Sequence, residues 1–587
     1  MVKTSLPKWV KTRYELLWAE FGDKEFNMDD IEKVLKEKDV EKQNMQGVPV
    51  LISELKNAGW LSVKLDPEDS RKRIYNLKSF DQVMGEAFHK ISRGDLNAIL
   101  KKAADLIRTR VDYKFILILL FLKRISDKWE LEFEKAYKEA IKDGFPEKDA
   151  KKEAKNESYH DFVIPEEYLW DNIRKDVNKL PENFSKGLKT LAEKNPELKD
   201  ILDTTDFIQF TTNRENAEIL RQLVELFSEK KLHEVSADVL GDAYEWILSY
   251  FAPQKAKEGE VYTSREVIQL LIEMLDPKPT STIYDPACGS GGMLITAHQY
   301  VENEYSRKDA DKLGLYGQEY NHKTLAFAKM NHYIHDIRNN HLMLGDTLLY
   351  PKFKDEDNVT QFDMVIANPP WNQDGYDENV VKKGDFWKKR FTYGFATKQS
   401  ADWIWIQHML ASAKNKKGKV GVVIDNGCLF RGGAEKIIRT SVIDDDLIEC
   451  VILLPEKLFY NTGAPGAIMI LNKGKEEKRK GKILFINATN EYGQHPEVRK
   501  LNILAAENIG KIVDAYKEYE DNDGFSRSVD LDEIKENEYN LNVSLYVFPE
   551  EEIEDIDIKK EWEEYLGIKQ DSEKLEKEVI DIIKTIH

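Results

Sequence analysis

The sequence predicts an α/β fold built on a Rossmann-like sheet, and three observations support this prediction. Residues 281–284 form a short β-type run, a glycine-rich turn follows, and residues 293–297 have the character of a helix. Two further strand-like steps end in acids, at Glu319 and Asp346, and an apolar run over residues 362–367 ends in Asn368. Strands that alternate with helices indicate a sheet whose ligands bind at the carboxyl ends of the strands.

The glycine-rich turn is the first candidate binding element. Glycine lets the backbone approach a ligand without a Cβ in the way, and a strand, a glycine-rich turn and a helix in this order are typical of nucleotide-like ligand sites. The turn lacks the G-x-G-x-x-G spacing, so on its own it is a weak signal. Its residues are Asp285, Pro286, Ala287, Cys288, Gly289, Ser290, Gly291 and Gly292.

Acids at the next two strand ends extend this site. Glu319 follows the strand-like residues 313–318, where a carboxylate suits the hydroxyls of a ribose. Asp346 and Thr347 follow another strand-like step, where the acid can accept a hydrogen bond from an adenine amino group. We therefore expect one ligand crevice at the carboxyl edge of the sheet, next to Asn368.

The second candidate element is the tetrapeptide Asn368, Pro369, Pro370 and Trp371. The exocyclic amino group of a base is a poor nucleophile, because its lone pair is delocalised into the ring. Two oxygen acceptors, the side chain of Asn368 and the backbone carbonyl of Pro369, would draw such a nitrogen toward tetrahedral geometry. The two prolines stiffen the turn, and the Trp371 ring offers a face on which a purine can stack. The alternative is an ordinary proline-rich turn after a buried strand.

Together these motifs resemble the amino-group DNA methyltransferases that form N6-methyladenine. Residues 260–265, which precede the glycine-rich turn, are similar to the family's segment for the methionine end of S-adenosylmethionine. The motifs for the cofactor precede the motif for the target base along the chain, which is the gamma order of this family. The resemblance implies S-adenosyl-L-methionine as cofactor and catalysis by the tetrapeptide. In this segment it implies cofactor contacts by Glu260, Val261, Tyr262, Thr263, Ser264 and Arg265, with Ser264 where relatives often carry proline.

Further segments are similar to the modification subunit of Type I restriction–modification systems, over about residues 81–550. They include residues 401–403 at the start of a helix, residues 430–435, residues 454–463 and the closing residues 539–546. The resemblance implies methylation of a flipped adenine in duplex DNA. It also implies a separate specificity subunit flanked by two copies of this chain, and an ATP-dependent restriction subunit in the full complex.

The composition agrees with recognition of the DNA sequence by a separate subunit. The chain has 587 residues, of which 41% are hydrophobic, and its net charge of −19 argues against a self-sufficient duplex binder. The three cysteines are spaced neither as a disulfide framework nor as a zinc site, and no other metal-ligand cluster stands out. No signal core, membrane-length apolar run or Walker A motif stands out, so we expect a cytoplasmic protein that is not itself a DNA translocase.

Four domains are expected along the chain. Residues 1–80 contain three helical patterns and two short strands, which suggest a winged-helix-like unit. Basic residues 71–73 of this unit either contact DNA or form a solvated face, and the unit is alternatively a protein-docking module. Residues 81–235 are expected to be helical, and the resemblance assigns them to the family's N-terminal domain, which touches DNA and neighbouring subunits. The alternative is a helical bundle that only braces the catalytic domain. Residues 236–490 form the methyltransferase domain, in which we expect parallel strands.

Residues 491–587 are expected to form a helical C-terminal tail for subunit docking. The last helix carries Leu575, Val579, Ile582, Ile583 and Ile586 on one stripe, which fits either a partner's helix or the chain itself. Residues 372–399 are aromatic-rich and only weakly periodic. They form either a loop that becomes ordered when a base enters, or a fixed surface cover.

Three alternatives to a Type I modification subunit stay open from the sequence. One is a stand-alone adenine methyltransferase whose N-terminal unit reads DNA. Another is a methylase of protein glutamine or structured RNA, although such enzymes usually carry tyrosine in the tetrapeptide and are shorter. The third is a non-catalytic scaffold that binds the cofactor. Only about 95 residues follow the catalytic motifs, which is less than a domain for reading a long bipartite site.

Overall fold

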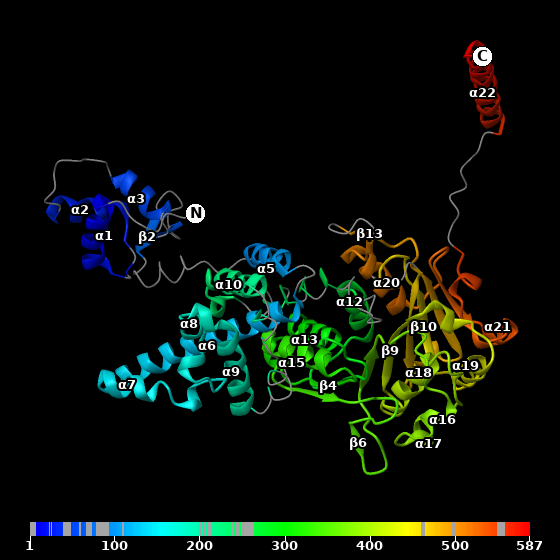
Figure 1. The fold of residues 1–587 in the computed structure, drawn as a ribbon, viewed down its shortest axis with the longest axis horizontal. Helices are drawn as coiled ribbons and strands as arrows, with labels where there is room; N and C mark the ends of the chain where they lie inside the picture. Colours follow the sequence, from blue (N-terminus) through cyan, green and yellow to red (C-terminus); the bar gives the residue numbers. More distant parts are fainter. Residues whose placement is uncertain are drawn as a thin grey trace. The chain divides into compact units, whose positions relative to one another are not determined.

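The computed structural model divides the chain into two compact units (Figure 1). The first unit comprises Met1–Tyr262 and Pro279–Lys352, and the second comprises Thr263–Lys278 and Phe353–His587. The structure describes residues 8–22, 24, 26–38, 48–57, 60–65, 73–77, 93–107, 111–195, 198, 202, 207, 210–211, 214–235, 240–241, 243–244, 246–247, 250–251, 263–459, 464–495, 501–548 and 558–586.

The N-terminal elements match the expected winged-helix-like unit. Three helices, α1 (Lys8–Phe21), α2 (Met28–Lys38) and α3 (Val48–Asn57), precede an antiparallel hairpin of β1 (Leu61–Leu65) and β2 (Arg73–Leu77). Their apolar faces enclose a core of their own, which includes Leu17, Leu55 and Trp60. Of the basic cluster, Arg73 begins β2 and is exposed, whereas residues 71 and 72 lie outside the described residues.

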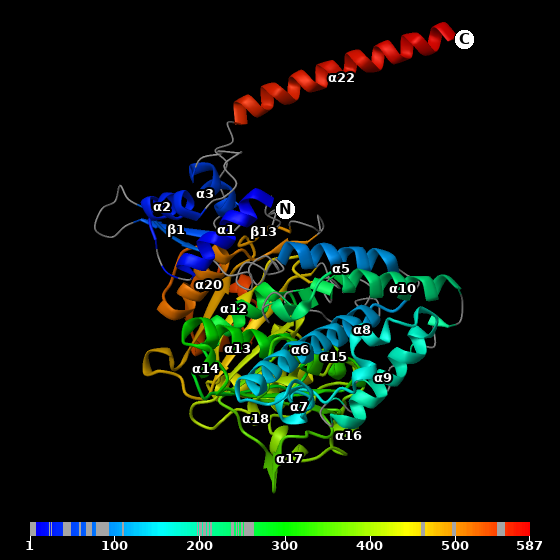
Figure 2. The same ribbon diagram turned by 90° about the vertical axis from the view of Figure 1, so that its left-hand side faces the viewer.

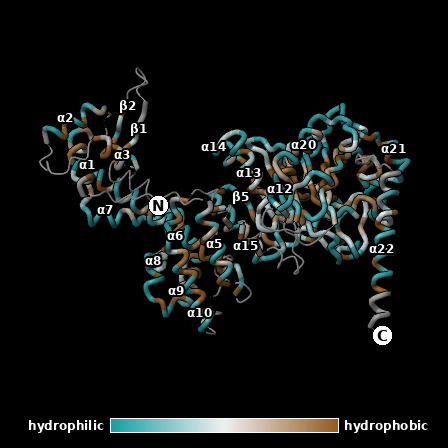
Figure 3. Tube along the Cα trace, turned by 90° about the horizontal axis from the view of Figure 1, so that it is seen from above, coloured by the Kyte–Doolittle hydropathy of each residue, from teal (hydrophilic) through white to brown (hydrophobic). Residues whose placement is uncertain are grey.

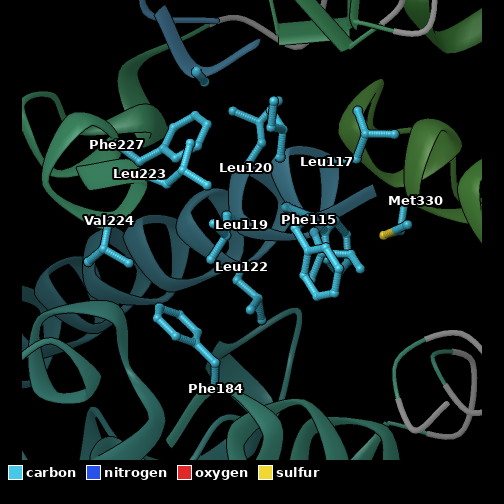
Figure 4. Packing of buried hydrophobic residues seen from close by; sticks show 14 of the residues in the cluster. Phe115, Leu117, Leu119, Leu120, Leu122, Phe184, Leu223, Val224, Phe227 and Met330 are labelled. Carbon is cyan, nitrogen blue, oxygen red and sulfur yellow. The ribbon is translucent and has the colours of Figure 1, made fainter. Parts of the chain in front are cut away.

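A helical region follows in the first unit, as the apolar periodicity of residues 96–106, 115–125 and 215–227 predicted. Its main helices are α5 (Arg93–Ile107), α6 (Lys114–Lys142), α9 (Leu180–Lys194) and α10 (Arg214–Ser228), with the shorter α7 (Glu147–Glu153) and α8 (Trp170–Ile173). The first two turns of α6 are buried on every side, against Phe184 of α9, Leu223 and Phe227 of α10 and Met330 (Figure 4). Helices α5 and α10 lie side by side (Figure 2).

Three parallel strands of the first unit carry the glycine-rich turn. They are β3 (Thr282–Asp285), β4 (Gly314–Glu319) and β5 (Asn340–Leu344), which are neighbours in that order. The helices α13 (Gly292–Glu304) and α15 (His322–Ile334) connect them, and the short α14 (Arg307–Ala310) precedes β4. Met330 of α15 joins the core of the helical region, so this region and the three strands form one packed body.

Six strands of the second unit lie in the order β15-β12-β10-β11-β9-β8. They are β8 (Met364–Ala367), β9 (Lys419–Asp425), β10 (Ile448–Leu453), β11 (Gly466–Asn472), β12 (Lys482–Asn487) and β15 (Ser526–Asp530). The expectation of parallel pairing is correct for β8 with β9 and for β10 with β12. It is wrong for β11, which pairs antiparallel with β9 and β10. Strand β15, which lies beyond the residues of that expectation, pairs antiparallel with β12.

Backbone hydrogen bonds explain the antiparallel strands. The Leu454 N–H donates to the Gly466 carbonyl at 3.0 Å, so β10 ends where β11 begins and the chain reverses direction. The Asn487 N–H donates to the Phe525 carbonyl at 2.8 Å, which joins β12 to β15 in the same way. Parallel neighbours need a crossover to the opposite end of the sheet, and neither connection provides one.

Helices and two small hairpins complete the second unit. The helices are α12 (Arg265–Leu275), α16 (Glu378–Val381), α17 (Trp387–Arg390), α18 (Asp402–Ala411), α19 (Ala434–Asp444), α20 (Ala506–Glu518) and α21 (Leu531–Glu536). The hairpins are β6 (Lys354–Asp355) with β7 (Asn358–Val359), and β13 (Gly493–Gln494) with β14 (Asn502–Ile503). Helix α12 packs against α20 and β9.

The predicted C-terminal tail is not a helical appendage throughout. Strand β15 is the edge strand next to β12, so residues 526–530 belong to the sheet of the second unit. The last helix, α22 (Ile558–Ile586), carries both hydrophilic and hydrophobic residues along its described part (Figure 3). Leu575 is 61% exposed and Val579 is 53% exposed, whereas the side chains of Ile582, Ile583 and Ile586 lie outside the described residues. The boundaries expected at residues 80, 235 and 490 stay proposals.

None of the helices within the described ranges combines the length and the apolar character needed to cross a bilayer.

Candidate active site

The glycine-rich turn is a tight, hydrogen-bonded loop between β3 and α13. The Asp285 side chain accepts a hydrogen bond from the Ala287 N–H at 3.0 Å, and the Gly291 N–H donates to the Cys288 carbonyl at 2.8 Å. Gly289 and Gly291 have φ angles of 53° and 81°. These left-handed values suit glycine, which explains two of the glycines in the motif.

The structure brings the turn together with the ends of the next two strands. Glu319, the last residue of β4, accepts from the Gly289 N–H at 3.0 Å and from the Asn321 N–H at 2.7 Å. After β5, the Thr347 hydroxyl donates to the Pro286 carbonyl at 2.7 Å. Asp346 accepts from the Leu349 N–H at 3.1 Å. Within the first unit, the predicted residues from Asp285 to Thr347 therefore form one cluster at the carboxyl ends of three strands.

Helix α15 supports the turn from behind, which the sequence reading missed. The Asn331 side chain donates to the Ser290 carbonyl at 3.1 Å. A Cβ on Gly291 would lie 2.8 Å from Nε2 of His332, so the imidazole ring fills the space beneath this glycine. Burial lowers the pKa of His332 to about 3, so the ring is neutral at pH 7. Two adjacent polar residues on an otherwise apolar helix face were the signal available in the sequence.

The turn has the features that an adenosyl cofactor needs. A Cβ built on Gly289 would meet no atom within 4 Å, so the backbone borders open space on that side. The Glu319 carboxylate lies directly beside this glycine, and its two oxygens accept from the Gly289 and Asn321 N–H groups. A carboxylate acceptor beside an exposed glycine backbone is the arrangement expected for a ribose diol.

Asp285 has an unusual environment for a carboxyl group. Its side chain is buried, with 2% of its surface exposed. Burial raises the pKa of Asp285 to about 8; the hydrogen bond from Ala287 opposes this rise, and the negative charge of Glu319 adds to it. At pH 7 the Asp285 carboxyl is therefore largely protonated, and a cation bound nearby would favour its ionised form.

Asn368 lies directly after β8, and its side-chain amide is held at both ends. The amide nitrogen donates to the Thr263 hydroxyl at 2.7 Å, and the amide oxygen accepts from the indole N–H of Trp371 at 2.8 Å. An indole N–H can only donate, so the amide end that faces Trp371 must be the oxygen. Since an amide oxygen has two lone pairs, one remains for a further donor.

Trp371 is fixed in place by its own contacts. Its indole N–H also approaches the Val423 carbonyl of β9 at 3.3 Å. Its ring meets Phe459 edge to face, with ring centroids 4.9 Å apart and an interplanar angle of 69°. A Cβ on Gly466 would approach both rings within 3.0 Å, so glycine is needed at the start of β11. The ring is half-buried, which leaves part of its surface accessible.

The second predicted acceptor is the backbone carbonyl of Pro369. Among the described residues, none donates a hydrogen bond to this oxygen. Prolines at 369 and 370 fix two successive φ angles, so the carbonyl direction is set by the turn itself. The tetrapeptide thus offers one side-chain oxygen and one main-chain oxygen with unused acceptor capacity.

The predicted cofactor segment, residues 260–265, is only partly described. Glu260, Val261 and Tyr262 lie outside the described residues. Ser264 is the N-cap residue of α12 and Arg265 is the first residue of that helix. Thr263 accepts a hydrogen bond from the Asn368 amide, a contact that the sequence analysis did not predict.

Close packing of α12 on β9 accounts for the position of Thr263. A Cβ on Gly421 of β9 would lie 2.6 Å from Cδ1 of Leu271 and 2.9 Å from Cδ1 of Leu275. Glycine at 421 therefore lets α12 approach the sheet closely. Because Thr263 precedes the N-cap of α12, this packing helps to deliver its hydroxyl to Asn368.

Residues 372–399 contact α18 through side chains and backbone. Arg390 and Phe391 are buried. The Tyr393 N–H donates to the Gln407 side chain of α18 at 2.9 Å, and the Gln407 amide donates to the Gly394 carbonyl at 3.0 Å. The Trp405 indole donates to the Gln373 side chain at 2.9 Å. Of the two readings of this segment, the fixed surface cover agrees with these contacts.

Comparison with known protein families gives two matches. Residues 235–555 match the model of the N-6 DNA methylase family, and residues 96–227 match that of the HsdM N-terminal domain. The chain is 46% identical over 568 residues to the Type I restriction enzyme MjaVIII methylase subunit of Methanocaldococcus jannaschii, covering 95% of this chain and 94% of that protein. It is 45% identical over 588 residues to the MjaVII methylase subunit of the same organism, covering 98% and 96%.

Solved structures give a consistent result. The methyltransferase subunit of a type I restriction-modification system from Streptococcus thermophilus is 26% identical, with a TM-score of 0.68. The match covers 78% of this chain and 100% of that chain. A modification subunit of a putative type I restriction enzyme from Vibrio vulnificus shares the fold, with 19% identity and a TM-score of 0.54 over 76% of this chain and 94% of that chain.

The Asp285 carboxyl predicts a pH dependence of stability. Its pKa is 3.8 in the reference state and about 8 in the folded chain, so between these values the folded state holds one more proton than the unfolded state. Stability should therefore fall as the pH rises from about 4 to about 8, by about 3 kcal/mol between pH 5 and pH 7. Asp285→Asn should remove this dependence, as measured by the melting temperature of both proteins across this range. Parallel pH profiles of the two proteins would contradict the prediction.

The contact between Thr263 and Asn368 predicts a specific loss of methyl transfer. Thr263→Val removes the acceptor of the Asn368 N–H bond, which should lower kcat by about tenfold, equivalent to one lost hydrogen bond of 1–2 kcal/mol. Thr263→Ser keeps a hydroxyl and should stay close to the wild type. Cofactor affinity, measured by calorimetry, should change little in both variants. A large loss of cofactor affinity with an unchanged kcat would instead return Thr263 to the cofactor segment.

Proposed function

The chain belongs to the N-6 DNA methylase family, as a methylase subunit of the Type I restriction enzymes, and we propose that residues 368–371 carry its chemistry. It is an adenine-specific DNA methyltransferase, the modification subunit of a Type I restriction–modification system. The observation that supports this choice of site is the Asn368 amide, whose oxygen is oriented by the Trp371 indole at the end of β8.

Asn368 and Pro369 are the groups that activate the adenine amino nitrogen in this proposal. The two N–H bonds of N6 donate to the Asn368 side-chain oxygen and to the Pro369 carbonyl. Positive charge develops on N6 as the new bond to carbon forms, and two oriented carbonyl dipoles stabilise that charge more than they stabilise the neutral amine. The methylated nitrogen is acidic and loses its proton readily, so no strong general base is required.

Trp371 is the stacking surface for the target base, and Pro370 holds that ring beside Asn368. Methylation of an amino group within a duplex requires the base to leave the stack, which costs a few kcal/mol. Stacking on an aromatic ring recovers ~1–3 kcal/mol. Support comes from the contacts of Trp371 with Val423 and Phe459, which keep the ring from turning away.

The family and fold imply S-adenosyl-L-methionine as cofactor, and we assign its adenosine half to the first unit. When bound, this cofactor supplies a methyl group on a positively charged sulfur. Glu319 would accept from the ribose hydroxyls, Asp346 would accept from the adenine amino group, and the 285–292 turn would lie along the ligand. Thr347 and Asn331 hold the turn through the Pro286 and Ser290 carbonyls. Of residues 260–265, all but Thr263 would contact the methionine part, because the Thr263 hydroxyl accepts from Asn368.

The partners proposed for the chain follow from its similarity to Type I methylase subunits. These subunits act on DNA within complexes that also contain specificity and restriction subunits. We propose that a specificity subunit flanked by two copies of this chain chooses the sequence, and that an ATP-dependent restriction subunit joins them. The net charge of −19 supports this division, because duplex binding depends on Lys and Arg at phosphates. Helix α22 is the proposed docking element.

Replacement of Asn368 tests the catalytic assignment. In the complex assembled with its specificity subunit, Asn368→Ala should reduce methyl transfer to adenine by at least about 10²–10³-fold, since it removes an oriented acceptor from the transition state. Asn368→Asp keeps oxygen acceptors and should retain more activity than Asn368→Ala. Cofactor binding should be unchanged in both. Methylation by Asn368→Ala at the wild-type rate would remove this residue from the mechanism.

Substitutions on α22 test the docking assignment. Leu575→Glu combined with Val579→Glu places charges on two exposed apolar positions and should abolish co-purification with the specificity subunit. Lys577→Glu lies between them in sequence, on another face of the same helix, and serves as the control. Cofactor affinity should be the same in all three proteins. Co-purification of the double variant at the wild-type yield would exclude this stripe as the docking surface.

A further inference from the structure

The residue after the catalytic tetrapeptide is held by two separate contacts. Asn372 has a left-handed backbone conformation, with φ at 53°. Its backbone N–H donates to Oδ1 of Asp402 at 2.9 Å, and its side-chain oxygen accepts a hydrogen bond from Arg431. Asp402 begins α18, and Arg431 lies between β9 and α19. Two segments distant in sequence therefore fix the point at which the chain leaves the catalytic turn.

Arg431 is also the cation of a compact ionic cluster. It donates to Oδ2 of Asp402, lies 3.2 Å from Oε2 of Glu435, and lies 3.7 Å from Oδ2 of Asp425. Asp402 and Glu435 are 3% and 4% exposed. Three carboxylates thus share the Arg431 guanidinium, and two of them are removed from water. Nearby Arg439 directs its donors to the Tyr539 and Arg431 carbonyls at 2.8 and 2.9 Å.

Removal of the Arg431 charge would change the state of these carboxyls. Burial raises the pKa of Asp402, and the charge of Arg431 opposes this rise. Burial likewise raises the pKa of Glu435, again opposed by Arg431. Cys428 and Glu435 are further titratable groups that interact electrostatically with Asp402, while Asp425 and Arg439 act on this cluster through Arg431. An ionised Asp402 is the stronger acceptor for the Asn372 N–H, so the contact that holds the turn depends on the guanidinium.

We propose that Arg431 is a positioning residue for methyl transfer, which acts with Asp402 through Asn372 to keep the Asn368 amide and the Pro369 carbonyl aimed at the adenine amino group. The inference rests on the proposed function of residues 368–371. Only Pro370 and Trp371 separate Pro369 from Asn372, and proline fixes its φ angle. A displacement of Asn372 therefore moves the end of the short turn that carries the Pro369 carbonyl. The sequence region 430–435 resembles the family but had no assigned role, and this contact supplies one.

The test compares Arg431→Met and Arg431→Lys in the complex assembled with its specificity subunit. Arg431→Met removes the charge and both donors at similar length. It should lower kcat by about 30–100-fold while cofactor affinity stays within about twofold. Arg431→Lys restores the charge and should recover kcat to within about tenfold of the wild type. A loss of kcat without a loss of cofactor affinity identifies a positioning role, because a general loss of structure would reduce both.

The pH profile gives a second readout. Without the guanidinium, Asp402 should take up a proton at a higher pH, so kcat of Arg431→Met should fall on the acidic side at a higher pH than kcat of the wild type. Arg431→Lys should move the acidic fall in kcat back toward the pH at which it occurs in the wild type. Superimposable pH profiles of the wild type and Arg431→Met, together with equal kcat values, would overturn the proposal.

Asn372→Gly keeps the inference testable should Arg431→Met fail to fold. Glycine accepts a positive φ and keeps the backbone bond to Asp402, but it lacks the side-chain acceptor for Arg431. Asn372→Gly should lower kcat several-fold, while the pH at which kcat falls on the acidic side should stay as in the wild type. A wild-type kcat would count against a role for the contact between Arg431 and the Asn372 side chain. A failure of the proposed function is distinguishable, because Asn368→Ala would then remain active regardless of the result at Arg431.

Discussion

The orientation of one amide governs the proposed chemistry. The two ends of the Asn368 side chain are similar in size but opposite in hydrogen-bonding character, and only the oxygen can accept a bond from an adenine amino group. The Trp371 indole can only donate, so its hydrogen bond selects the oxygen, and Thr263 takes the opposite end. The ring on which the target base is proposed to stack is therefore also the group that orients the acceptor. This coupling makes the aromatic residue more than a hydrophobic surface.

The contacts of Asn368 also explain why a segment before the glycine-rich turn belongs with residues far along the chain. Thr263–Lys278 is grouped with the second unit, whereas the turn and Glu319 are in the first. Helix α12 packs on β9 through the gap left by Gly421, and the residue before its cap reaches Asn368. A segment that resembles a cofactor-binding motif thus contributes directly to the target half. A threonine hydroxyl can donate and accept at once, so its bond to Asn368 leaves its own proton available.

The sequence was sufficient to predict the fold class, because glycine-rich turns and acids at strand ends can be recognised from short stretches of sequence. It identified the strands that end at Asp285, Glu319 and Ala367, and the three helices and hairpin at the N-terminus. It did not identify the antiparallel direction of β11, whose buried apolar sequence looks the same in either direction. It also missed the short, mostly polar strand β15. Nor did it identify Asn331 or the Arg431 contacts. A long-range contact between a helix side chain and a loop carbonyl has no local signature in a single sequence.

The composition and the exposed residues of the chain both support the proposal that a partner subunit recognises the DNA sequence. In a chain with a net charge of −19, phosphate contacts require either a local basic groove or a partner that supplies cations. Helix α22 exposes Trp562, Ile568 and Leu575 by 59%, 66% and 61%, in a helix that is otherwise strongly charged. Exposed apolar side chains repeated along a helix are favoured only where another surface covers them. Such a helix suits the proposed attachment to a specificity subunit more than the reading of bases.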